Sequence, residues 1–234
     1  MKKKKIMSVQ PDDAKVFLSD NSPFPIKEAF KTLRTNVMFS LPGAGSKCIG
    51  ITSANRGEGK SSVSIQLALS FAQINKKVII IDCDMRLPTI SSKLGLDPGK
   101  GLSDYLVRSN DDEKLNIIHL DDKGIDVVTS GKIPPDPTAL LESDNMKKLI
   151  EKLKEEYDYI IVDFPPIIVV TDAVILADKI DGYLVVIRQN VSEFAKIDET
   201  LKQMEFANAN LIGFVYNGKS YDSMLGKGKY YKYK

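Results

Sequence analysis

Short apolar stretches alternate along the chain with longer segments in which apolar residues recur every three or four positions. The first pattern is typical of β-strands and the second of amphipathic helices, so their alternation predicts a parallel sheet built from βαβ units. Unbroken apolar runs at residues 78–81 and 160–162 predict strands buried on both faces, because helices cover both sides of a doubly wound sheet. The expected strands are 48–52, 78–82, 116–119, 126–129, 159–163, 183–187 and 210–215, and the expected helices are 26–39, 60–74, 137–156, 171–177 and 192–208.

The chain of 234 residues has no internal repeat and no segment with the composition of an interdomain linker. We therefore predict a single α/β domain that spans residues 26–217. Residues 1–25 are expected to form a mobile N-terminal segment, and residues 218–234 a mobile C-terminal tail.

The net charge of +2 is unevenly distributed along the chain. Four of the first five residues are Lys, and residues 219–234 contain five Lys and one Asp. The long stretch between these ends has more acidic than basic residues, which argues against nucleic-acid binding, because a phosphate-binding face needs clustered Lys and Arg. Basic ends favour contact with lipid headgroups or acidic partners.

The chain contains two cysteines, Cys48 and Cys83, which are too few and too far apart for a disulfide framework or a zinc site. We interpret both as core thiols in a reducing compartment. The longest apolar runs are much shorter than the ~20 residues that cross a bilayer. These features predict a cytosolic protein.

A glycine-rich segment, Ser-Ala-Asn-Arg-Gly-Glu-Gly-Lys-Ser-Ser at 53–62, lies directly between a predicted strand and a predicted helix. Such a loop lets backbone N–H groups converge on phosphate oxygens at the positive end of the helix dipole. Lys60 is expected to reach the β- and γ-phosphates, and the Ser61 hydroxyl to bind Mg²⁺. The residues predicted to hold the nucleotide are Gly57, Glu58, Gly59, Lys60, Ser61 and Ser62. The loop therefore predicts binding of ATP or GTP.

Three carboxylates are expected at the carboxyl edge of the sheet, where ligands of α/β proteins bind. Asp82 and Asp84 follow one apolar strand and point the same way if the chain stays extended, and Asp163 ends a later strand. Paired carboxylates can hold Mg²⁺ or accept a proton from an attacking hydroxyl, and a lone Asp after an apolar strand is typical of a Walker B motif. The predicted catalytic residues are Lys60, Asp82, Asp84 and Asp163, and the predicted magnesium ligands are Ser61, Asp82 and Asp163.

Four of the nine tyrosines, Tyr221, Tyr230, Tyr231 and Tyr233, lie within the last sixteen residues among Gly, Ser and Lys. A segment of this composition cannot bury its rings, so the hydroxyl groups are expected to be accessible. Without the nucleotide motifs, such a tail would favour binding to lipid or nucleic acid.

Segments 54–62, 79–86 and 160–166 resemble the Walker A, Walker A′ and Walker B motifs of the bacterial tyrosine kinases, and the resemblance covers roughly residues 25–217. The middle segment is the discriminating one, because three apolar residues precede an Asp-x-Asp-x-Arg pattern. The resemblance implies a P-loop NTPase fold and transfer of phosphate from ATP to tyrosine with Mg²⁺. It further implies nucleotide contacts from Arg86 and Asn217, with Asn217 near the adenine, and autophosphorylation of the tail tyrosines.

Residues 28–34 are similar to the oligomerisation helix of that family, with Glu28, Lys31 and Arg34 at its charged positions. The resemblance therefore implies a homo-oligomeric ring that regulates capsular or exopolysaccharide synthesis. It also implies a membrane-anchored activator that recruits this cytoplasmic chain to the inner face of the membrane. A cognate phosphotyrosine phosphatase and protein substrates of polysaccharide synthesis would complete the set of partners.

Two other functions fit the nucleotide motifs. One is a positioning ATPase like MinD and ParA, although such proteins usually carry an extra Lys early in the loop, where this chain has Asn55 and Arg56. The other is a regulatory subunit that binds nucleotide with weak turnover. Formation of phosphotyrosine distinguishes the kinase from both.

Overall fold

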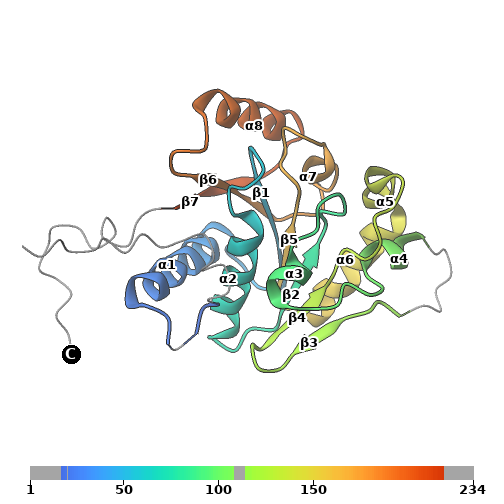
Figure 1. Ribbon diagram of the computed structural model, residues 1–234, viewed down its shortest axis with the longest axis horizontal. Helices are drawn as coiled ribbons and strands as arrows, with labels where there is room; N and C mark the ends of the chain where they lie inside the picture. Colours follow the sequence, from blue (N-terminus) through green and yellow to red (C-terminus); the bar gives the residue numbers. More distant parts are fainter. Residues whose placement is uncertain (1–16, 20, 108–113, 219–234) are drawn as a thin grey trace, which may run out of the picture.

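The computed structural model describes residues 17–19, 21–107 and 114–218 (Figure 1). Its seven strands form one sheet in the order β3-β4-β2-β5-β1-β6-β7. All neighbouring strands run parallel except β3 and β4, which confirms the predicted, mainly parallel sheet. The strands are β1 (Lys47–Ser53), β2 (Val78–Asp82), β3 (Ile118–Leu120), β4 (Ile125–Val128), β5 (Tyr159–Asp163), β6 (Gly182–Arg188) and β7 (Leu211–Asn217).

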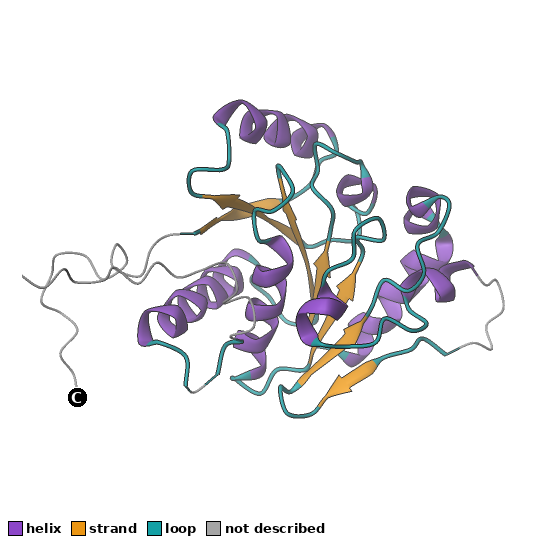
Figure 2. Cartoon of the chain, in the orientation of Figure 1, coloured by secondary structure: helices purple, strands orange, loops and turns teal. Residues whose placement is uncertain are grey.

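Helices cover both faces of this sheet (Figure 2), as the apolar runs predicted. The first three helices pack on one face and the last five on the other. The helices are α1 (Phe24–Ser40), α2 (Lys60–Ala72), α3 (Ile90–Leu94), α4 (Leu102–Val107), α5 (Pro137–Glu142), α6 (Asp144–Glu156), α7 (Asp172–Ile175) and α8 (Phe194–Phe206). In the part of the chain that the structure describes, no helix is both long and apolar enough to cross a membrane.

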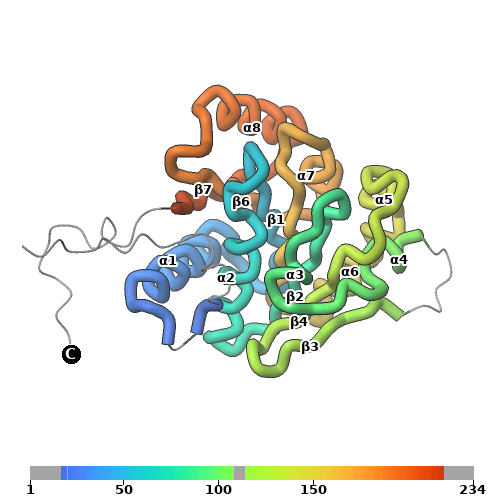
Figure 3. Tube along the Cα trace, in the orientation of Figure 1, coloured from blue at the N-terminus to red at the C-terminus, as the bar shows by residue number. Residues whose placement is uncertain are grey.

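The strands alternate their side chains between the two helical layers. Ile80 and Ile161 pack in the cluster that includes α1 and α2, whereas Ile79 and Ile160 pack in the cluster on the opposite face. All four are fully buried, and each contributes roughly 1.5–3 kcal/mol through removal of its side chain from water. Strand β1 lies between β5 and β6, so segments distant in sequence meet at the centre of the sheet (Figure 3).

The helices differ from the prediction in two respects. The helix expected over residues 137–156 is divided into α5 and α6, because Ser143 is extended (φ −63°, ψ 153°) and its Oγ accepts a hydrogen bond from the Met146 N–H. Serine favours such an N-cap over a helix interior. The short helices α3 and α4 were not predicted, because five or six residues are too few for a helical period to emerge.

The packed structure extends on the N-terminal side of the boundary expected at residue 26. Helix α1 begins at Phe24, and Leu18 is buried in the same cluster as α1 and α2. The Leu18 N–H donates to Oε1 of Gln66 on α2, at 2.6 Å. Residues 1–16 and 219–234 lie outside the described residues, including Tyr221, Tyr230, Tyr231 and Tyr233, so the expected mobility of both ends stays a prediction.

Candidate functional site

The phosphate-binding loop joins β1 to α2, in the strand–loop–helix order that the sequence predicted. Gly57 and Gly59 both have positive φ angles, 78° and 97°, which glycine adopts without the strain that a Cβ would cause. A Cβ on Gly59 would also meet Nδ2 of Asn217 at 2.1 Å. The loop therefore needs glycine at residue 59 both for its backbone angle and for the close approach of β7.

A cleft of about 380 Å³ opens over this loop. Most residues predicted to hold nucleotide line it, namely Gly57, Gly59, Lys60, Ser61, Ser62, Arg86 and Asn217, together with Asp84. Glu58, Asp82 and Asp163 are fully buried and are not among its lining residues. Three further cations and three apolar side chains also line it, namely Arg56, Lys93, Arg188, Leu87, Val169 and Val170.

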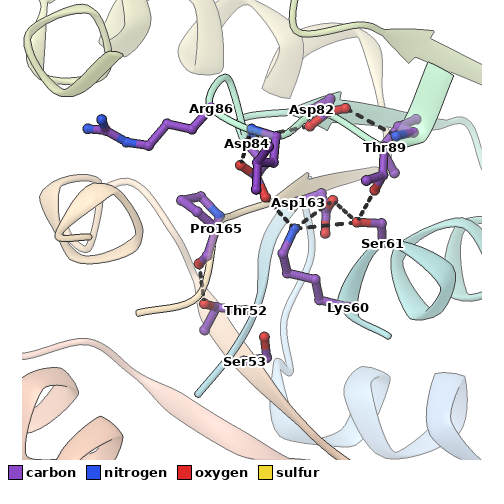
Figure 4. A network of polar contacts seen from close by, with 12 residues as sticks. Thr52, Ser53, Lys60, Ser61, Asp82, Asp84, Arg86, Thr89, Asp163 and Pro165 are labelled. Carbon is purple, nitrogen blue, oxygen red and sulfur yellow. Dashed lines mark hydrogen bonds and ion pairs between the residues drawn. The ribbon is translucent and has the colours of Figure 1, made fainter. Parts of the chain in front are cut away.

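Lys60 lies between two of the predicted carboxylates (Figure 4). Its Nζ is 2.8 Å from Oδ2 of Asp84 and 3.5 Å from Oδ2 of Asp163. The Ser61 hydroxyl donates to Oδ2 of Asp163 at 2.6 Å and accepts from the Thr89 hydroxyl at 2.8 Å. Four residues from three separate motifs thus meet at the start of α2.

Asp82 and Asp163 are partners in the pairing of β2 with β5, which places two buried carboxylates side by side. Burial raises the pKa of Asp82 well above its usual range, and the charge of Asp163 raises it further. Burial also raises the pKa of Asp163, against the opposing effects of Lys60 and two serine hydroxyls. Burial by itself lowers the pKa of Lys60, but the charges of Asp163 and Asp84 outweigh it, so the net direction is upward.

The two carboxylates of the Asp-x-Asp pair do not play the same part in the structure. Asp84 accepts the Leu87 N–H on Oδ1 at 3.1 Å but turns Oδ2 toward Lys60 and lines the cleft. Asp82 accepts backbone N–H groups on both oxygens, from Asp84 at 3.2 Å and from Ile90 at 3.2 Å (Figure 4). Asp82 therefore holds the turn that follows β2 in place.

Arg86 points away from Lys60 (Figure 4). Its Nε lies 3.4 Å from Oδ2 of the buried Asp172, and its NH2 donates to the Thr138 hydroxyl at 3.0 Å. The Thr138 hydroxyl in turn donates to Asp172 at 2.9 Å. The Arg86 side chain therefore joins the turn after β2 to α5 and α7. Its contact with the nucleotide stays a prediction.

Sequence reasoning missed several residues that support the site. Ser64 follows Lys60 by one helical turn, and its hydroxyl donates to Oδ1 of Asp163 at 2.9 Å. That spacing on a predicted helix was a usable signal. Thr89, Thr138 and Asp172 gave no comparable signal, because they reach the site from loops and short helices that only the tertiary fold brings near.

The predicted oligomerisation residues occupy α1, but they do not form one free surface. Glu28 and Lys31 form an exposed ion pair at 3.4 Å. The Arg34 guanidinium instead donates to the backbone oxygen of Ser70 and to its hydroxyl, so it holds α1 against α2 of the same chain.

The donors in the cleft suit magnesium. Among the described residues, no group of three His, Cys, Asp or Glu side chains could cage a metal by itself. Mg²⁺ in nucleotide sites is typically bound by one or two oxygen ligands of the protein and by the phosphates, so Ser61 and Asp163 are sufficient. Three carboxylates face one Lys in this cluster, and a divalent cation would balance the excess negative charge.

Residues 46–211 match the profile of a protein family described as an AAA domain. Together with the phosphate-binding loop at the carboxyl edge of a parallel sheet, this match defines the class of the molecule as a P-loop nucleotide-binding domain. A plasmid partition protein from Borrelia burgdorferi, 20% identical with a TM-score of 0.55 over 77% of this chain and 84% of that chain, shares the fold. For the predicted positioning-ATPase alternative this likeness is distant and shows the fold alone.

The nearer similarities identify the family. Tyrosine-protein kinase YwqD of Bacillus subtilis is 37% identical over 203 residues, which cover 87% of this chain and 85% of that protein. Tyrosine-protein kinase CpsD of Streptococcus agalactiae is 38% identical over 208 residues, which cover 88% and 89%. The structure of the kinase domain of the Escherichia coli tyrosine kinase ETK superposes with a TM-score of 0.77 at 32% identity, covering 87% of this chain and 82% of that chain. The chain belongs to the bacterial tyrosine kinases, as its motifs predicted.

Proposed function

We propose that the cleft binds ATP with Mg²⁺ and transfers the γ-phosphate to tyrosine hydroxyls. The observation that carries this proposal is the position of Lys60, which lies between Asp84 and Asp163 at the first turn of α2. A loop of this geometry binds phosphate through backbone N–H groups and the helix dipole. The proposed transfer to tyrosine follows from the membership of the chain in the bacterial tyrosine kinases.

Each residue at the base of the cleft has a distinct part in this proposal. Lys60 exchanges its carboxylate partners for the β- and γ-phosphates, and Ser61 and Asp163 would hold the magnesium ion. When bound, magnesium neutralises charge that builds up on the transferred phosphate. Phosphoryl transfer needs little covalent help, so these residues act by orientation and by electrostatic stabilisation.

Asp84 is the better placed of the two candidate bases. It lines the cleft, while both oxygens of Asp82 already accept backbone N–H groups. We propose that Asp84 orients the incoming tyrosine and accepts its proton. Asp82 then supports that position through the backbone of Asp84 itself.

The proposed acceptors are Tyr221, Tyr230, Tyr231 and Tyr233. The last described residues, Asn217 and Gly218, end β7 beside the loop, since Asn217 donates to the Glu58 carbonyl oxygen at 2.9 Å. The segment that carries the four tyrosines is therefore attached close to the cleft. A tail attached there presents its hydroxyls to neighbouring copies at high local concentration.

We further propose that the chain acts as a homo-oligomer, assembled as a ring through α1, in which Glu28 and Lys31 face a neighbouring copy. A cytoplasmic segment of a membrane-anchored activator would recruit it to the inner face of the membrane, and a phosphotyrosine phosphatase would reverse its reaction. The proposed process is capsular or exopolysaccharide synthesis. Light scattering of the Glu28→Ala, Lys31→Ala variant, compared with wild type, tests the assembly.

The substitution Lys60→Met tests the proposed reaction. We expect no detectable phosphotyrosine and a loss of ATP affinity of about 100-fold, because the phosphates lose their charged partner while the loop backbone remains. Lys202→Met, which removes a Lys exposed on α8, serves as the matched control and should retain activity. Incubation with Mg²⁺-ATP and an activator segment, followed by detection of phosphotyrosine, gives the measurement. A wild-type chain that hydrolyses ATP without labelling tyrosine would contradict the kinase assignment.

A further inference from the structure

Glu58 presents an unusual group for a loop that binds phosphate. Its side chain is 0% exposed, although the neighbouring Arg56 is exposed. A carboxylate repels the phosphates of ATP, and Glu58 is not among the residues that line the cleft. The carboxylate is therefore held inside the protein, away from the position of the nucleotide.

Both carboxylate oxygens of Glu58 accept hydrogen bonds. Oε2 accepts the backbone N–H of Asn55 at 2.9 Å, and Oε1 accepts the hydroxyl of Ser192. The same Ser192 oxygen accepts the backbone N–H of Arg188 at 2.7 Å. One carboxylate thus joins the beginning of the phosphate-binding loop to the turn between β6 and α8.

Two further contacts fix the backbone on either side of this carboxylate. The Arg188 guanidinium donates to the Gly57 carbonyl oxygen at 2.7 Å, and Nδ2 of Asn217 donates to the Glu58 carbonyl oxygen at 2.9 Å. In a trans peptide the C=O and the following N–H point in opposite directions. Holding these two carbonyls therefore aims the N–H groups of Glu58 and Gly59 away from Arg188 and Asn217.

We infer that Glu58 is a positioning residue for the nucleotide. Through Ser192 it holds the loop in the conformation that binds phosphate, before any phosphate is present. Preorganised donors bind more tightly because the ordering cost is already met in the free protein. This inference rests on the proposed nucleotide-binding function and adds a role for a side chain that does not touch the nucleotide.

The substitution Glu58→Ala tests the inference through nucleotide affinity. We expect the dissociation constant for Mg²⁺-ADP, measured by calorimetry, to rise about tenfold, because two hydrogen bonds to a charged acceptor are lost. The KM for ATP should rise in parallel while kcat at saturating ATP stays within about twofold. Loss of folded protein alone would lower the apparent kcat and leave KM unchanged.

Glu58→Gln should restore most of the affinity, because its amide oxygen can accept from Asn55 and its NH₂ can donate to Ser192. Ser192→Ala should weaken binding in the same direction, and the Glu58→Ala, Ser192→Ala double variant should be little weaker than Glu58→Ala alone. Glu193→Ala is the matched control, since it removes an exposed carboxylate from the same turn, where Glu193 contacts Lys196. Its affinity should equal that of wild type.

Wild-type affinity in Glu58→Ala would overturn the inference. If Glu58→Ala fails to fold, Ser192→Ala decides, and unchanged affinity in that variant overturns the inference equally. Binding of Mg²⁺-ADP is measured without reference to phosphotyrosine. A wild-type chain that binds ADP but labels no tyrosine would therefore refute the proposed kinase reaction and leave the positioning role standing.

Discussion

At the scale of single residues, the site depends on which carboxylate faces the cleft. Asp82 and Asp84 stand two positions apart in sequence, yet Asp82 accepts backbone N–H groups on both oxygens, whereas Asp84 accepts the Leu87 N–H on one oxygen and Lys60 on the other. The turn after β2 causes this difference, because Asp82 is the last residue of the strand and Asp84 lies beyond it. Asp84 is therefore the candidate catalytic residue, and Asp82 stabilises the turn that holds Asp84 in place.

Asp84→Asn and Asp82→Asn should therefore fail in different ways. Asp84→Asn should lower the rate of tyrosine phosphorylation about 100-fold or more at saturating Mg²⁺-ATP, with ATP affinity little changed. Asp82→Asn places an NH₂ group against a backbone N–H, so we expect a loss of about 1–3 kcal/mol in the free energy of unfolding. Transfer assays and thermal denaturation of both variants give the comparison. Equal stability and full activity in both would show that the pair is only a turn.

Asp158 lies at the edge of the sheet opposite the cleft, and its pKa predicts how the free energy of unfolding depends on pH. The backbone N–H of Lys77 donates to its carboxylate at 2.8 Å and lowers its pKa, partial burial opposes this, and Lys76 at 3.3 Å lowers it further. A lowered pKa in the folded state stabilises the protein above the unfolded pKa of about 3.9, and this stabilisation is lost as the pH falls through the folded value.

Asp158→Ala should thus lower the free energy of unfolding by about 1 kcal/mol at pH 7, a modest value because the side chain is 40% exposed. The difference from wild type should shrink as the pH falls below the unfolded pKa of about 3.9. Urea denaturation across this range measures it, with Asp122→Ala, at an exposed position, as the control. A difference independent of pH would mean that the charge of Asp158 has no part in it.

At the scale of elements, the separation of α5 from α6 allows the two helices to contact different parts of the protein. Helix α5 carries Thr138 toward Asp172 and Arg86, while α6 packs along the sheet through Met146 and Leu149. One continuous helix could not do both, because its axis would have to follow a single direction. Ser143 sets the break by ending one helix and capping the next.

Ser143→Ala should lower the free energy of unfolding by about 1 kcal/mol, because the Met146 N–H loses its side-chain partner. Ser143→Asp should retain the stability of wild type, since Asp is an equally good N-cap and adds a favourable charge at the helix N-terminus. Urea midpoints of the three proteins give the comparison. An unchanged midpoint for Ser143→Ala would show that the packing of α6 alone holds the break.

At the scale of the whole molecule, two of the described tyrosines are hydrogen-bonded within the domain. The hydroxyl of Tyr183 donates to the backbone oxygen of Ala173 and that of Tyr157 to Asp126, so both are engaged within the domain. Burial, followed by the hydrogen bond to Asp126, raises the pKa of Tyr157 above its usual range. Neither of these two hydroxyls is free to accept phosphate, whereas Tyr216 is 54% exposed.

Removal of residues 219–234 should eliminate most autophosphorylation and leave ATP binding intact. Mixing this truncated enzyme with full-length Lys60→Met protein should place phosphate on the inactive full-length chain, since transfer occurs between copies. Mass spectrometry identifies the labelled residues, and a mixture without Mg²⁺ is the control. Phosphate found mainly on Tyr105, Tyr157 or Tyr183 would contradict the assignment of the tail.

The sequence by itself determined the features whose signals are local. Apolar runs located all seven strands within a few residues, and the runs of β2 and β5 are unbroken because these strands are buried on both faces. The loop at 53–62 and the Asp residues after β2 and β5 were predicted by their place between elements, since parallel strands bring their carboxyl ends to one edge.

Only the tertiary structure decided which of these side chains face the cleft and which are paired with other groups of the protein. Glu58, expected to contact the nucleotide, is buried against Ser192, and Arg86 is paired with Asp172. The turn between β6 and α8 and helix α7 supply these partners, which are more than 80 residues away in sequence. Arg34 likewise binds Ser70 within its own chain. Local pattern fixes where a strand ends, but the direction of a side chain depends on which groups the fold packs around it.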